Sequence, residues 1–151
     1  MALSALLRIL LLFLAFALSG CSAQRLERDF FRGDLSTRNQ RLAGYTMEEQ
    51  WQIYLYGNQV IHPPATGLAE VLARGHEPML RFILRRLEST RNDLDYRDSM
   101  VVFQTMQWHG DYSICGDEAA FSKIKSNQYR IENADWQRVY GEMLQELCRS
   151  K

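Results

Sequence analysis

Hydrophobic residues recur at helical spacing through most of the chain after residue 45. The stretch TMEEQWQIYLYG opens with Thr46 and Glu49, the two residues of a capping box, and closes at Gly57. Trp51 and Tyr54 stand three residues apart in it, so they are expected to share the buried face of a short helix.

The same pattern predicts five further helices, each with its own start or stop residue. The segment 92–109 contains MVVFQTM and is apolar most of the way round, so it is the expected central helix. Its β-branched pair, Val101 and Val102, also suits a strand, but the length and the acidic start of the segment favour a helix. In the last helix, apolar residues keep helical spacing up to Leu147. The predicted ranges are 68–74, 78–87, 92–109, 117–125 and 133–147.

These elements predict an all-α domain over residues 46–151, with five or six short helices packed as antiparallel hairpins. No β-hairpin signal interrupts the pattern. The prolines in HPPATG, residues 62–67, break the chain after the first helix because they remove two amide donors and fix φ. Gly75 and Gly110 are expected to stop the second and fourth helices.

Residues 21–45 have a different composition and are predicted to be a flexible tether. From residue 22 to residue 45 the chain has five Arg and three acidic residues, and its one pair of adjacent aromatic residues is Phe30–Phe31. A coil of this length would span about 25 to 30 Å. The alternative to a fully flexible tether is that Phe30 and Phe31 pack on the helical domain.

Residues 1–20 have the three parts of a secretory signal. Arg8 supplies the charge, ILLLFLAFAL forms the apolar core, and Ser19 and Gly20 are small. A helix that spans a bilayer needs about 20 apolar residues, and this core is shorter. We therefore expect a signal peptide that is cleaved.

Leu18, Ser19, Gly20 and Cys21 together resemble the lipobox of bacterial lipoproteins at all four positions. The resemblance implies that the Cys21 thiol receives a diacylglyceryl group, that cleavage precedes Cys21, and that the freed amine is acylated, for example with palmitate. The lipid bilayer is then a partner through Cys21. An ordinary signal peptide, with Cys21 placed by chance, is the alternative.

The residue after the lipidated cysteine bears on the location of such a protein. In lipoproteins of Gram-negative bacteria, Asp at this position resembles an inner-membrane retention signal, and this chain has Ser22. An outer-membrane protein facing the periplasm is therefore expected. A surface lipoprotein of a Gram-positive bacterium would have a similar sequence.

Charge argues against a nucleic-acid partner. Without Arg8 the chain keeps 17 of its 18 Lys and Arg residues against 18 Asp and Glu, a formal charge of −1. A protein that binds phosphates through a basic stripe has a different charge distribution.

Cys115 and Cys148 are the remaining cysteines, and in an exported domain such a pair predicts a disulfide. Cys148 follows Leu144 by four residues, which places it on the buried face of the last helix. The alternative is catalytic: Cys115 in HGDYSICGD would be a nucleophile with His109 as its base.

No metal ion or cofactor is predicted. His62, His76 and His109 are separated by 14 and 33 residues, whereas local zinc motifs place ligands about two to five residues apart. The neighbouring carboxylates at 48–49 and 117–118 lie in first turns of helices, where the helix dipole favours them. The sequence has no nucleophile elbow, phosphate loop or dinucleotide fingerprint.

The leading functional hypothesis is a non-catalytic module that binds a protein partner, as an envelope-assembly factor or as an immunity protein against a delivered toxin. An enzyme acting on the cell wall is the alternative. The predicted contact residues are Tyr56, Asn58 and His62, in and beside the loop 57–67, which two prolines stiffen. If Val60–Ile61 packs inward, the loop is only a connector.

Overall fold

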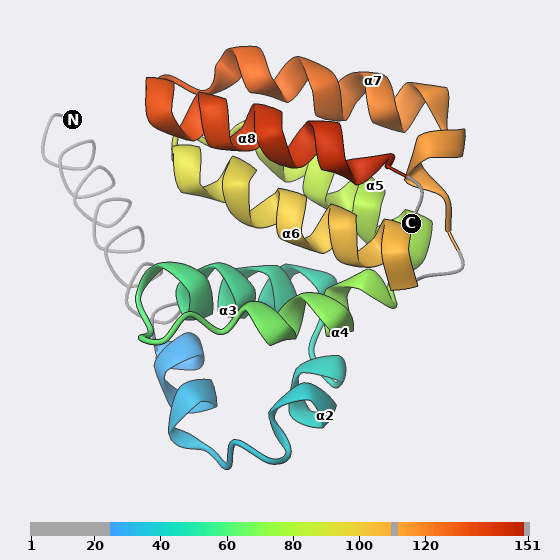
Figure 1. Cartoon of the computed structure of the whole chain (residues 1–151). Coiled ribbons are helices and arrows are strands. Elements are labelled where there is room, and N and C mark those ends of the chain that lie inside the picture. The colour runs from blue at the N-terminus through green and yellow to red at the C-terminus, as the bar shows by residue number, and fades with distance from the viewer. Residues whose placement is uncertain (1–24, 110–111, 150–151) are drawn as a thin grey trace, which may run out of the picture. The chain divides into compact units, whose positions relative to one another are not determined.

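The computed structural model describes residues 25–109 and 112–149, so the predicted signal peptide, Cys21 and Gly110 lie outside the described residues. The regular structure of the described residues is helical, which confirms the all-α class (Figure 1). The chain forms two compact units, residues 1–38 and 39–151. A helix covers 25–32, and the labelled helices are α2 (Arg38–Ala43), α3 (Met47–Gln59), η1 (Thr66–Leu68), α4 (Ala69–Ala73), α5 (His76–Leu87), α6 (Asp93–His109), η2 (Ile114–Gly116), α7 (Glu118–Asn127), η3 (Gln128–Arg130) and α8 (Ala134–Leu147).

Two of the helices lie in the segment that the sequence assigned to a flexible tether. From Met47 onward the structure has six α-helices, and the helix over 25–32 and α2 raise the number beyond the predicted five or six. The arginines that made the segment look like a polar linker also stabilise its first helix. Asp29 lies 3.8 Å from Arg25 and 3.4 Å from Arg32, at i,i+4 and i,i+3 spacing. That the segment separates the domain from a lipid anchor stays a prediction.

The start of α3 is as predicted, but its end is not. The Thr46 hydroxyl accepts a hydrogen bond from the Glu49 amide at 3.3 Å, and the Glu49 carboxylate accepts one from the Thr46 amide at 2.9 Å. The helix then continues past Gly57 to Gln59. Gly57 is buried, and its carbonyl accepts a hydrogen bond from Ala65 N at 3.0 Å, so the following loop folds back over this turn.

The α6 helix is central, as predicted. It packs against α3, α4, α5 and α8, and Val102, Phe103 and Met106 have no exposed surface. Its most extensive contacts are with α4 and α8, which are not its neighbours in sequence. A scheme of sequential hairpins therefore describes only part of the packing, because the apolar surface of α6 is wider than one adjacent helix can cover.

α4 ends at Ala73, one residue before the predicted end, and Gly75 lies between α4 and α5, where the structure shows why a glycine is needed. A Cβ atom at this position would lie 2.7 Å from the Cβ atom of Met79 in the next helix. The chain therefore turns more tightly into α5 than a side chain would allow. Pro78 lies in the first turn of α5, where a missing amide donor costs little.

The Cys115–Cys148 disulfide is present, with the two Cα atoms 5.8 Å apart. It joins η2 to the residue that follows α8 and so ties the two ends of the C-terminal half together. Cys148 itself is exposed, so its predicted place on the buried face is wrong. Leu147 is the last helical residue and is buried, and the backbone leaves helical geometry at Cys148.

Without reductant, alkylation followed by peptide mapping should find no free thiol at Cys115 or Cys148. Closing a loop of 33 residues is worth about 3 to 4 kcal/mol on the chain-entropy model, so Cys148→Ala should lower the melting temperature by several degrees or more. The variant lacking both cysteines is the control and should melt with the single variant. Two alkylated thiols in the native oxidised protein would contradict the disulfide.

Candidate functional site

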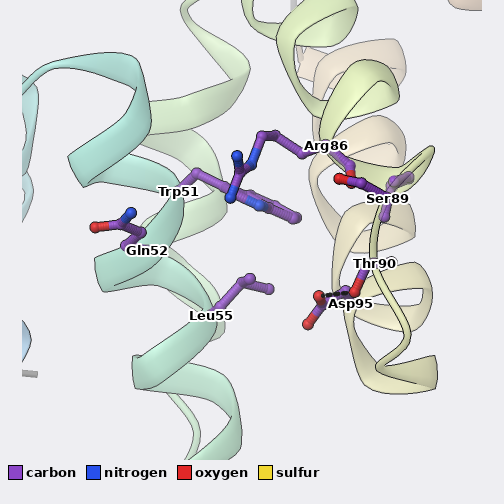
Figure 2. Close-up of a pocket in the computed structure, with 8 residues that line it drawn as sticks. Trp51, Gln52, Leu55, Arg86, Ser89, Thr90 and Asp95 are labelled. Carbon is purple, nitrogen blue, oxygen red and sulfur yellow. Dashed lines mark hydrogen bonds between the residues drawn. The ribbon is translucent and has the colours of Figure 1, made fainter. Parts of the chain in front are cut away.

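A cleft of about 160 Å³ lies between α3 and the connection from α5 to α6 (Figure 2). One wall is α3, the opposite wall is the end of α5, and the first turn of α6 closes one end. The lining residues are Trp51, Gln52, Leu55, Arg86, Leu87, Ser89, Thr90 and Asp95. The cleft thus combines an aromatic ring, two leucines, one cation and one carboxylate.

The aromatic wall is Trp51, which the sequence predicted to be buried and which is 3% exposed. Its ring stacks on Tyr54 with centroids 5.7 Å apart, and the Tyr54 hydroxyl donates to the Asp98 carbonyl at 2.9 Å. Figure 2 shows the Trp51 ring extending from α3 across the cleft towards Arg86. Within the described residues the indole N–H of Trp51 has no hydrogen-bond acceptor.

The carboxylate of the cleft is Asp95, and neutral groups hold it in place. Oδ1 accepts from Gln59 Nε2 and Asn92 Nδ2, both at 3.0 Å, and Oδ2 accepts from Thr90 Oγ1 at 2.6 Å. No lysine, arginine or histidine nitrogen of the described chain lies within 4.0 Å of this carboxylate. Asp95 is therefore fixed in position but not neutralised.

The cation of the cleft, Arg86, has its own partner. Its guanidinium lies 3.4 Å from the Glu48 carboxylate, and Gln52 Nε2 donates to the same carboxylate at 2.8 Å. Both charged side chains are about half exposed, so water screens the pair and it can rearrange at low cost.

A buried acid next to the cleft holds α3 against α6. Asp98 is 2% exposed, and burial raises the pKa of its carboxyl above the ordinary value. Gln59 Nε2 donates to it at 3.0 Å, and Arg97 donates through two nitrogens at 2.8 and 2.6 Å. Gln59 thus bonds both Asp95 and Asp98, which fixes the last turn of α3 beside the cleft.

Sequence reasoning did not assign Asp95 to a site. In the sequence, an acid in the first turn of a helix is explained by capping and by the helix dipole. The sequence feature that could have indicated this site is a group of polar residues at the start of the expected central helix: Thr90, Asn92 and Asp95. Only the fold brings Gln59 and Trp51 to them from α3.

The structure separates the three residues predicted to contact a partner. His62 is exposed and Tyr56 is half-buried, whereas Asn58 is 5% exposed and donates to the Tyr54 carbonyl at 3.2 Å. Val60 is 53% exposed, so this side chain does not pack inward. The loop therefore presents Val60 and His62 at the surface, and partner binding by them stays a prediction.

Cys115 has no free thiol, since its sulfur is bonded to Cys148. The alternative that Cys115 acts as a nucleophile is therefore wrong for the oxidised protein. His109, its expected base, is an exposed residue at the end of α6.

Asp117 caps α7 and stands at the centre of a small polar cluster. Its carboxylate accepts from Ala120 N at 2.9 Å, from Arg81 Nη2 at 2.8 Å and from the Tyr112 hydroxyl. The bond from Tyr112 is the main cause that lowers the pKa of Asp117, while burial raises the pKa of Tyr112 to about 12. These contacts give Asp117 a structural role.

The cluster predicts a loss of stability in acid. Because the folded protein lowers the pKa of Asp117, its contribution is present above the ordinary value of 3.8 and is lost as the pH falls through the folded value. By carbon-detected NMR, the Asp117 carboxyl should titrate below 3.8, and Tyr112→Phe should move the midpoint upward. A midpoint that is unchanged in Tyr112→Phe would contradict the role of this hydrogen bond.

The described residues hold no group of three His, Cys, Asp or Glu side chains arranged to bind a metal ion. Among them, no helix has both the length and the apolar composition that crossing a bilayer requires. Comparison of the chain with protein-family models, curated proteins and solved structures finds no match.

Proposed function

We propose that this chain is a bacterial lipoprotein, anchored through Cys21 in the outer membrane and facing the periplasm. Two features that are independent of each other support this. The lipobox at residues 18–21 is complete, and the disulfide between Cys115 and Cys148 belongs to proteins of oxidising compartments such as the periplasm.

The helical domain acts as a non-catalytic module that binds a protein, either an assembly factor of the envelope or a toxin that it neutralises. The cleft carries this proposal, because Trp51 and Asp95 both line it and each has a hydrogen-bonding position that no described residue occupies. The exposed loop with Val60 and His62 begins directly after Gln59, which bonds Asp95. Cleft and loop together form a candidate contact surface with an aromatic and a charged part.

An enzyme acting on the cell wall is less well supported. Of the two groups that the sequence offered for catalysis, Cys115 is bonded to Cys148, and His109 lies exposed at the end of α6. The binding module needs no such groups.

Cys21→Ser should abolish lipidation and release the protein from the membrane fraction, because the hydroxyl does not replace the thiol in the thioether bond. Metabolic labelling with an acyl-chain analogue and membrane fractionation measure this. The Cys115→Ala/Cys148→Ala variant is the control and should still incorporate the label. A wild type that incorporates no label would contradict the lipid anchor.

Replacing the exposed loop residues should weaken capture of the partner without unfolding the domain. Val60→Ser combined with His62→Ala should lower recovery of crosslinked partner from intact envelopes about fivefold or more, while melting shifts little. Tyr129→Ala is the matched control, because Tyr129 is 84% exposed and lies in η3. Equal recovery from both variants would remove the loop from the contact surface.

The same preparation separates binding from catalysis. A turnover of cell-wall fragments that His109→Ala abolishes in a folded protein would overturn the binding-module proposal. Crosslinked partner recovered by wild type, with no such turnover, supports it.

A further inference from the structure

We propose that the cleft binds one basic side chain, a lysine ammonium or an arginine guanidinium, that the protein partner presents. This deepens the proposed function and rests on it. The charged head binds Asp95, the alkyl stem lies along Leu55 and Trp51, and a carbonyl of the same segment accepts the Trp51 N–H.

The charge distribution of the cleft favours a cation. Arg86 is matched by Glu48 at 3.4 Å, whereas the donors to Asp95 among the described residues are the neutral side chains of Gln59, Asn92 and Thr90. The charges of Arg86, Glu48 and Asp95 therefore sum to −1 at the cleft. This negative charge opposes an anionic ligand and attracts a cationic one.

Asp95 also has room for one more donor. A carboxylate offers about four lone-pair positions, and the three hydrogen bonds use two on Oδ1 and one on Oδ2. The open position is on Oδ2. Because the three bonds hold the carboxylate in place before the partner arrives, little ordering entropy is lost when the cation binds.

Trp51 supplies the second, independent observation. Its side chain lines the cleft and is only 3% exposed, yet its indole N–H has no acceptor within the described residues. The Trp51 nitrogen is not one of the fully buried atoms that lack a partner, so water reaches it, and a ligand carbonyl would take the place of that water as the acceptor. The ring itself is the aromatic surface that cations prefer.

The shape of the cleft fits a long side chain with a charged end. The volume is about 160 Å³, and Figure 2 shows Leu55 of α3 pointing across the cleft towards Asp95, on the same wall as Trp51. Lysine and arginine bury their alkyl stems along apolar surface while the head reaches a polar group. One cleft can therefore satisfy both parts of such a side chain.

The test uses the full chain in detergent micelles, with ¹⁵N in the indoles of its three tryptophans. The probes are two capped tripeptides, one with lysine at its centre and one with Nε-acetyllysine, which has the same stem without the charge. The Trp51 resonance, assigned with Trp51→Phe, should shift saturably with the lysine peptide. The acetyllysine peptide should bind more weakly by at least about tenfold, because it lacks the charged hydrogen bond.

Asp95→Asn should weaken binding of the lysine peptide by about the same factor. The control is Asp135→Asn, which removes a carboxylate that is 88% exposed and should leave the binding of this peptide unchanged. If Asp95→Asn unfolds, the two peptides on wild type still decide. Equal binding of both peptides, or no shift of the Trp51 resonance, overturns the proposal.

The outcome for the cleft is distinguishable from that for the proposed function. Partner crosslinking that persists without any lysine-peptide binding overturns the cleft proposal alone. Selective lysine-peptide binding, in a protein that crosslinks no partner in the envelope, supports the cleft and overturns the proposed function.

Discussion

Burial of α6 is the constraint on which the rest of the structure depends. The middle of this helix is buried on several sides, and Met100, Val102, Phe103 and Met106 have no exposed surface. Water is excluded only if helices lie on several sides of it, and α3, α4, α5 and α8 do so. The domain is therefore a set of short helices arranged around one long helix.

The same burial creates the polar chemistry of the domain. Asp98 lies on a helix that is covered on several sides, so its carboxylate needs partners inside the protein, and Gln59 and Arg97 supply them. Asp95 lies nearly one turn earlier, where the cover of α6 ends and the cleft opens. Gln59 reaches both acids, so the element that stabilises the core also shapes the candidate site.

The C-terminal half is stabilised by local and covalent contacts. Asp117 caps α7 with help from Tyr112 and Arg81, and the Cys115–Cys148 bond closes the segment from η2 to the end of α8. Because a disulfide limits the unfolded chain, it suits a small exported domain whose core is modest. In the proposed function, this half keeps α8 against α6 while α3 and its loop are free to meet a partner.

The sequence by itself determined the features that depend on neighbouring residues. The Thr46–Glu49 capping box and the extent of α6 followed from side chains a few positions apart, and the Cys115–Cys148 pair followed from counting cysteines. The tether was the local exception, since its arginines suit both a linker and a helix. Only the tertiary structure decided that α6 packs on α4 and α8, that Cys148 is exposed, and that Trp51 and Asp95 line one cleft. Those features depend on contacts between residues distant in sequence, which no local spacing specifies.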